Sequence, residues 1–185
     1  GRPMDRSPDL EIGFDLPELD FDPVVPDLRL DVFRGGDWIT DFAQDVHRGL
    51  TADPPQLQPK YFYDARGSEL FDRITELPEY YPTRAERSIL AERGSEMIAA
   101  AGARSLVELG SGSSEKTELL LAPLLQAHGE AVYVPIDVSE SAVRHASVRL
   151  IERYPGLRVH GVIGDFEKHL GGLPPDEGRL FAFLG

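Results

Sequence analysis

The sequence predicts an α/β protein whose core is a parallel β-sheet, and two observations lead to this prediction. From residue 105 onward, short apolar segments typical of buried strands alternate with longer segments of helical periodicity. Apolar residues make up 41% of the 185 residues, which is enough for a hydrophobic core. Strands joined by helices in this way are linked by right-handed crossovers and lie parallel in one sheet.

Four strands and three helical segments are predicted in this alternating region. The strands cover residues 105–109, 131–136, 157–163 and 179–184, and the helical segments cover residues 115–127, 140–153 and 166–170. A further helix precedes them, because Thr83 and Glu86 stand three positions apart before an apolar-periodic run, as in a capping box. We expect this helix to end near Gly102, since glycine commonly follows the last turn of a helix.

Residues 32–84 are predicted to form helical and loop segments. A helix is expected from an N-cap at Asp37 through His47, with apolar residues along one face. The remaining predicted segments are a proline-rich loop at 51–60, a short helical turn at 67–72 and a rigid aromatic loop at 78–82. Within that last loop, Tyr81 is expected to be a core aromatic residue.

The first 31 residues are predicted to be a disordered acidic tail. They hold nine acidic residues, three arginines and five of the 15 prolines, with no sustained period of 2 or 3.6 among the apolar residues. A short docking motif around residues 16–25 is the functional alternative. On the first interpretation, deleting residues 1–31 leaves the melting temperature unchanged.

The composition argues against several classes of protein. With 19 Lys and Arg against 32 Asp and Glu, the net charge of −13 disfavours a general nucleic-acid binder. No cysteine is present and the five histidines show no metal-ligand spacing, so we predict neither disulfides nor a metal site. The apolar runs stay shorter than the roughly 18 residues of a membrane span, and no secretory signal is recognisable. The expected compartment is the cytoplasm.

A glycine-rich segment follows the first predicted strand of the alternating region. Residues 110–117 read Gly-Ser-Gly-Ser-Ser-Glu-Lys-Thr. Two glycines directly after a strand let the backbone turn tightly and approach a ligand closely. The following helix N-terminus offers free N–H groups to a carboxylate or phosphate. A plain strand-to-helix turn is the alternative, because a Gly-x-Gly pattern alone does not distinguish the two.

Two known nucleotide-binding motifs each differ from this segment at one required position. A phosphate-binding loop needs glycine where Glu115 stands, and that carboxylate would lie beside phosphates. A dinucleotide fingerprint needs glycine or alanine where Ser114 stands, which is a milder departure. Phosphate hydrolysis is therefore disfavoured, and a dinucleotide ligand stays open.

Acidic residues follow the second and third predicted strands. Asp137 stands 25 positions after Gly112, where a carboxylate can accept hydrogen bonds from a ribose diol. Its alternative role is to cap the next helix, although Ser139 is equally well placed. Asp165 and Phe166 follow the third strand and offer an acceptor and an aromatic edge for an adenine. Together these strand ends fit an adenosine that carries an amino-acid tail, S-adenosylmethionine (SAM).

Three segments resemble the L-histidine Nα-methyltransferases of ergothioneine biosynthesis. They are Lys-Tyr-Phe-Tyr-Asp at 60–64, Leu-Pro-Glu-Tyr-Tyr-Pro-Thr-Arg at 77–84 and Glu-Leu-Gly-Ser-Gly-Ser-Ser-Glu-Lys-Thr at 108–117. The similarity is continuous from about Trp38 to Gly185. It implies a Rossmann-like class I methyltransferase sheet and a second, substrate-binding domain, to which residues 32–84 would contribute the N-terminal part.

The resemblance implies roles for individual residues. Those implied to bind SAM are Gly110, Lys116, Asp137, Asp165 and Phe166. Gly110 and Lys116 would contact the amino-acid end of SAM, with Lys116 acting from the first helical turn. Tyr80, and with it Tyr63 and Phe71, are implied to bind the substrate L-histidine. Their alternative role is that of core aromatic residues.

The resemblance also implies a reaction. The α-amine of histidine attacks the sulfonium methyl of SAM in line, up to three times, which yields the trimethyl betaine hercynine. The amine must be neutral, and α-amines titrate near pH 8 in peptides, so a neutral fraction exists near pH 7. Alignment of the reactants can therefore supply most of the catalysis without a strong general base. No residue is assigned as catalytic, and a monomer is expected for the full-length form.

The family's sheet continues with three more strands, so the chain is expected to be an N-terminal portion. Residues 85–185 would then be the first half of the methyltransferase domain, ending after the fourth strand, which becomes an edge. The 185-residue chain alone is expected not to methylate histidine at an appreciable rate. Two other functions stay open, a methyltransferase-like binding module without turnover and a dinucleotide-dependent oxidoreductase.

Overall fold

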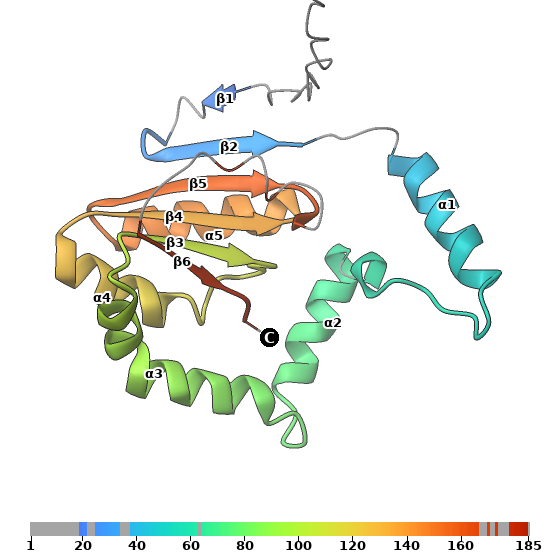
Figure 1. Ribbon diagram of the computed structural model, residues 1–185, viewed down its shortest axis with the longest axis horizontal. Coiled ribbons are helices and arrows are strands. Elements are labelled where there is room, and N and C mark those ends of the chain that lie inside the picture. Colours follow the sequence, from blue (N-terminus) through green and yellow to red (C-terminus); the bar gives the residue numbers. More distant parts are fainter. Residues whose placement is uncertain are drawn as a thin grey trace, which may run out of the picture.

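The computed structural model describes residues 19–21, 25–33, 38–62, 64–166, 170, 173 and 178–184. Within these residues six strands form one sheet in the order β1-β2-β5-β4-β3-β6 (Figure 1). The strands are β1 (Leu19–Phe21), β2 (Leu28–Val32), β3 (Ser105–Leu109), β4 (Ala131–Asp137), β5 (Leu157–Ile163) and β6 (Arg179–Ala182). Neighbouring strands are parallel except β1 and β2, which are antiparallel. The predicted α/β fold with a parallel sheet is confirmed.

The described part of the chain also contains helices. They are α1 (Trp38–Leu50), the 3-10 helix η1 (Pro59–Phe62), α2 (Ala65–Thr75), α3 (Pro82–Ala101), α4 (Glu118–His128) and α5 (Glu140–Arg153). Helices α4 and α5 pack against the strands, and α3 packs on α4. Helices α1 and α2 lie beyond the end of the sheet toward which the parallel strands point (Figure 1).

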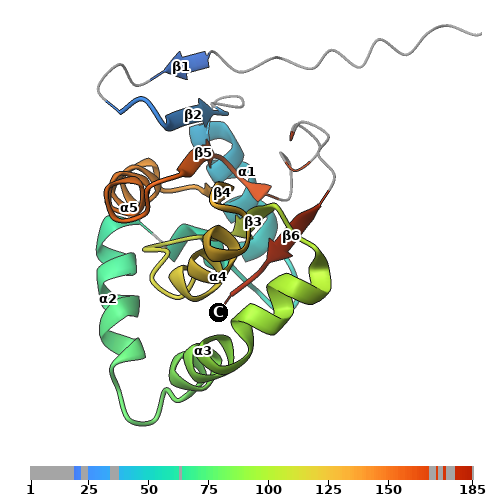
Figure 2. The same cartoon turned by 90° about the vertical axis from the view of Figure 1, so that its left-hand side faces the viewer.

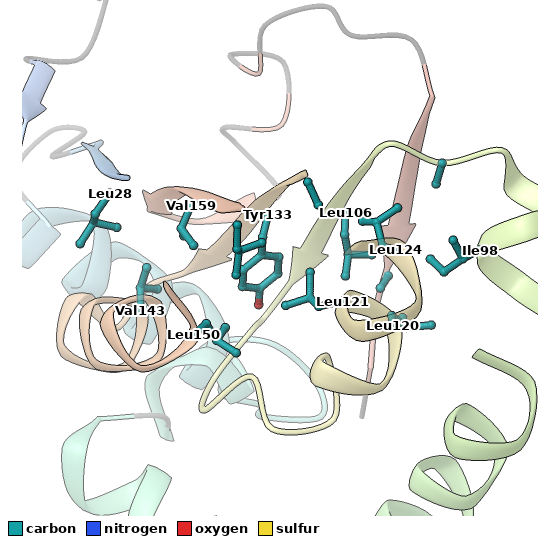
Figure 3. Close-up of a cluster of buried hydrophobic side chains, with 14 of the residues drawn as sticks. Leu28, Ile98, Leu106, Leu120, Leu121, Leu124, Tyr133, Val143, Leu150 and Val159 are labelled. Atoms are coloured by element: carbon teal, nitrogen blue, oxygen red, sulfur yellow. The ribbon is translucent and has the colours of Figure 1, made fainter. Parts of the chain in front are cut away.

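The core occupies both faces of the sheet, because side chains alternate across each strand. On the face covered by α4 and α5, Leu106 and Tyr133 pack with helical residues such as Leu121 and Leu150 (Figure 3). A second cluster contains the alternate strand residues Val107, Val134, Ile136 and Val162. Apolar residues on both faces are typical of central parallel strands. This packing makes the sheet a rigid support for the loops at its ends.

The elements after residue 104 agree closely with the sequence predictions. Strands β3 and β5 and helix α5 have the predicted bounds, and β4 is one residue longer than predicted. Strand β6 is two residues shorter than predicted, and α4 begins at Glu118 instead of residue 115. Most of the helical segment predicted at 166–170 lies outside the described residues. Strand β6 stands at an edge of the sheet, as predicted for the fourth strand (Figure 2).

Three local predictions before residue 104 are wrong. Thr83 and Glu86 do not form a capping box, because α3 begins at Pro82 with Tyr81 as its N-cap and no side-chain cap bond. Proline at the first helical position replaces the side-chain cap, since its fixed φ already suits a helix. Tyr81 is also exposed and not a core residue. The short turn predicted at 67–72 is the longer helix α2, capped by Asp64, whose Oδ1 accepts from the Gly67 N–H at 2.7 Å.

The predicted disordered tail over residues 1–31 is wrong for its C-terminal part. Residues 19–21 form β1, and β2 pairs in parallel with β5. Leu28 and Leu30 are buried in the main core. Deleting residues 1–31 would remove most of β2, so we now expect that deletion to lower the melting temperature. Residues 1–18 and 22–24 lie outside the described residues.

A charge cluster explains why this strand was missed. The Asp31 carboxylate on β2 accepts from Arg29 Nε at 3.0 Å and lies 2.5 Å from His160 Nε2 on β5. Asp31 is therefore buried beside two basic side chains. One of them comes from a strand far along the sequence, which a local pattern cannot reveal.

Across the described ranges, no helix is both long and apolar enough to span a membrane. In the same ranges, no cluster of three or more His, Asp or Glu side chains is arranged to hold a metal ion.

Candidate functional site

The carboxyl ends of β3, β4 and β5 meet at one edge of the sheet. The Gly110 N–H after β3 donates to the Ile136 carbonyl of β4 at 2.8 Å. The Gly164 N–H after β5 donates to the Asp137 carbonyl at 2.9 Å. The three strand ends predicted to contribute to one site are thus hydrogen-bonded to one another. Ligands of open parallel sheets bind at this kind of edge.

Asp137 lies at the centre of this edge. Its Oδ2 accepts from the Gly112 N–H at 3.0 Å, and its Oδ1 accepts from the Ser139 N–H at 2.9 Å. Ser139 caps α5 through its own hydroxyl, which accepts from the Ala142 N–H. Asp137 therefore does not serve as the helix cap. Each carboxylate oxygen can accept more than one hydrogen bond, so the side chain can still bind a ligand hydroxyl.

The glycine-rich segment leaves open space at this edge. Gly110 has a φ of 67° and Gly112 a φ of 47°, which are conformations that favour glycine. A Cβ built at either position meets no atom within 4 Å. The glycines are therefore required by the backbone conformation and not by crowding. The space beside them can admit a ligand close to the backbone.

Lys116 differs from its expected placement. It precedes the first residue of α4 by two positions, so it does not belong to the first helical turn. Its ammonium donates to Glu86 of α3, and both side chains are partly buried. An ammonium carries three donors, so this ion pair leaves capacity for a second anion.

Asp165 connects the sheet to the N-terminal helices. Its Oδ2 accepts from Lys60 Nζ at 3.3 Å, and the same ammonium lies 3.3 Å from Asp45 on α1. Tyr61 donates to Asp45 at 2.6 Å. The predicted adenine-binding carboxylate is therefore bridged to α1 and η1. Sequence reasoning did not find Lys60 or Asp45, because their spacing from Asp165 carries no local signal.

Some of the aromatic residues predicted to bind SAM or histidine contact one another. The rings of Phe71 and Tyr80 meet edge to face, with centroids 6.0 Å apart. Phe166 packs against the exposed Phe183 in the same manner, with centroids 5.8 Å apart. Tyr63 lies outside the described residues. The structure thus groups Phe71 with Tyr80 and keeps Phe166 at the sheet edge.

A buried polar network beneath the glycine-rich segment also escaped the sequence analysis. The Glu108 carboxylate of β3 accepts hydrogen bonds from Thr117 and Tyr133, and Tyr133 contacts Ser114. Burial, the largest cause, raises the pKa of Glu108 to about 7, although both hydrogen bonds and the charge of Lys116 oppose it. The available signal was a single ionisable residue, Glu108, inside a short and mainly apolar strand.

Comparison with known proteins identifies the family. The model of the histidine-specific, SAM-dependent methyltransferases matches residues 42–185. The chain belongs to this family. It is 54% identical to the histidine N-alpha-methyltransferase of Mycolicibacterium smegmatis over 142 residues, which are 77% of this chain and 44% of that protein. The protein of the same name from Mycobacterium tuberculosis is 49% identical over the same shares of both chains.

A fungal relative extends the comparison. Ergothioneine biosynthesis protein 1 of Neurospora crassa is 35% identical over 62% of this chain and 13% of its own length. The chain thus spans less than half the length of the bacterial relatives. Membership of the methyltransferase family confirms the resemblance drawn from the three sequence segments, and the comparisons give no support to a dinucleotide-dependent oxidoreductase.

Proposed function

We propose that this chain binds SAM at the edge formed by β3, β4 and β5 and takes part in methylating the α-amino group of L-histidine. The supporting observation is the bridge from Asp137 to the Gly112 N–H. This bond joins the glycine-rich segment to the acidic end of the next strand, beside open space at Gly110 and Gly112. The family model and the bacterial relatives favour the same reaction. Its product after three transfers would be the trimethyl betaine hercynine, and the name of the Neurospora relative favours the ergothioneine pathway.

The residues at this edge suit each part of SAM. Asp137 has the acceptor capacity for the ribose diol, and Asp165 with Phe166 suits the adenine. Lys116 suits the carboxylate of the amino-acid end, where it would share its charge between that group and Glu86. Gly110 permits close approach of that end to the backbone. When bound, SAM supplies an electrophilic methyl group on a sulfonium sulfur.

The aromatic pair suits the methyl acceptor. We assign Tyr80 and Phe71, together with Tyr63, to the binding of histidine. Their role would be to hold the α-amine in line with the methyl group, since alignment alone can accelerate a reaction strongly. A neutral fraction of the amine exists near pH 7, because α-amines titrate at about pH 8. Alignment of this kind does not depend on a strong general base.

Titration calorimetry of the protein with SAM and with NAD tests the donor. We expect saturable heat with SAM and none with NAD. Mass spectrometry of histidine and SAM incubated with the full-length protein then tests methyl transfer, with trimethylated histidine as the expected product. Binding of NAD in place of SAM would contradict the proposal.

Asp137→Ala is expected to weaken SAM binding about tenfold or more, because hydrogen bonds to a charged group contribute about 1.5–3 kcal/mol each. Ser139→Ala serves as the matched control. It removes the cap of α5 and lowers stability by about 0.5–2 kcal/mol, yet it leaves the Asp137 carboxylate in place. Calorimetric titration of both variants separates the two effects. Equal SAM affinity in Asp137→Ala and the unaltered protein would defeat the assignment.

A further inference from the structure

Four buried side chains link the strands to the glycine-rich segment. Glu108 on β3 is only 3% exposed, and its Oε2 accepts from Thr117 Oγ1 at 2.5 Å and from the Tyr133 hydroxyl of β4. The Tyr133 hydroxyl also lies 2.8 Å from Ser114 Oγ. Tyr133, Thr117 and Ser114 are all buried. The network therefore spans two strands and two points of the segment 110–117.

The chemistry of these groups gives the network one direction. Thr117 and Tyr133 both donate to the same oxygen of Glu108, Oε2, which can accept them whether the carboxyl is ionised or carries its proton on Oε1. A tyrosine has a single hydroxyl proton, which is then committed to Glu108. The hydroxyl of Ser114 must consequently donate to Tyr133. Every hydroxyl proton in the network has a partner, and such networks favour a single conformation.

The backbone of the segment needs this support. Ser114 has a φ of 55°, a left-handed backbone conformation that residues other than glycine rarely adopt. Its hydroxyl is hydrogen-bonded to Tyr133, and the Thr117 hydroxyl at the end of the segment donates to Glu108. At the edge of the sheet, the Asp137 carboxylate accepts a hydrogen bond from the Gly112 N–H. The segment is thus fixed between the buried network and the site.

We propose that Glu108, Tyr133, Ser114 and Thr117 form a positioning unit that fixes residues 110–117 in the conformation that binds the methyl donor. The SAM-binding role of that segment rests on the proposed function. Glu108 acts as a positioning residue and does not itself bind SAM, because it is buried and both of its hydrogen bonds are made within the network.

Hydrogen-exchange mass spectrometry of the whole chain tests the positioning role directly. Thr117→Val and Tyr133→Phe each remove one hydroxyl with little change in shape. We expect amide exchange across residues 110–117 to become about tenfold faster in both, the equivalent of one lost hydrogen bond, while α3 exchanges as before. Thr117→Ser keeps the hydroxyl and should restore slow exchange.

Ser147→Ala is the matched control for loss of a buried hydroxyl. Ser147 is as buried as Ser114, but its Oγ donates to the Val143 carbonyl within α5. This variant should leave exchange of residues 110–117 unchanged. If Thr117→Val and Tyr133→Phe also leave that exchange unchanged, the positioning unit is refuted, whether or not the protein binds SAM.

Titration with SAM separates this inference from the proposed function. With both correct, Thr117→Val and Tyr133→Phe weaken SAM binding about tenfold, and Thr117→Ser restores it. Faster exchange in the variants of a protein that does not bind SAM would support the ordering role and refute the donor assignment. Faster exchange with unchanged SAM affinity would show that the segment's conformation does not govern donor binding, which overturns the inference.

Discussion

Leu30→Ala is expected to lower the free energy of unfolding by about 2–5 kcal/mol, the range for truncating a buried leucine. Leu30 is 2% exposed and packs on β5, where Gly161 leaves room for it. A Cβ at Gly161 would lie 2.6 Å from the Leu30 side chain, so the two positions fit closely. Such packing leaves little scope for the neighbours to fill the cavity. The loss should therefore fall toward the upper part of this range.

Urea unfolding of Leu30→Ala beside Leu57→Ala measures this effect. Leu57 is 45% exposed in the loop between α1 and η1, so the same truncation there should change stability by less than about 0.5 kcal/mol. The comparison keeps the chemical change constant and varies only the burial. If both variants unfold at the same urea concentration, β2 is not part of the cooperative core.

Strand β2 was not predicted, because local sequence patterns do not show which distant strand it pairs with. The strands from β3 to β6 and helix α5 follow from local apolar patterns bounded by glycines and caps. Strand β2 has only five residues and carries Arg29 and Asp31 within a strongly acidic stretch. Its stability depends on Val159 and His160 of β5, about 130 positions away. No local pattern contains that information.

The residues of the candidate site were likewise predicted only in part from the sequence. Gly110, Asp137 and Asp165 were predicted because each lies at or just after the end of a strand, and parallel strands bring their carboxyl ends together. The partners that hold these residues were not found. Glu86 beside Lys116 and Lys60 beside Asp165 come from α3 and η1, so their pairing depends on how the helices pack. Sequence order thus predicted the candidate site, whereas tertiary packing determines the charges around it.

Ionisation of Glu108 is expected to make the stability of the protein depend on pH. Burial raises its pKa in the folded protein from the ordinary 4.5 to about 7. The folded state therefore binds this proton more tightly than the unfolded state does. The resulting stabilisation is fully present below about pH 4.5 and is lost as the pH rises through about 7. The total loss is about 3 kcal/mol, from the pKa difference at 1.36 kcal/mol per unit.

Glu108→Gln isolates this contribution, because glutamine cannot ionise. The free energy of unfolding of the variant, relative to the unaltered protein, should rise by about 3 kcal/mol between about pH 5 and pH 8. Glu130→Gln is the control, since Glu130 is 74% exposed at the side chain and its relative stability should be the same at both pH values. Urea unfolding at the two pH values gives all four differences. A constant difference for Glu108→Gln would mean that the buried carboxyl does not titrate in this range. A rise confined to that variant would show that the network beneath residues 110–117 retains a charge at the expense of global stability.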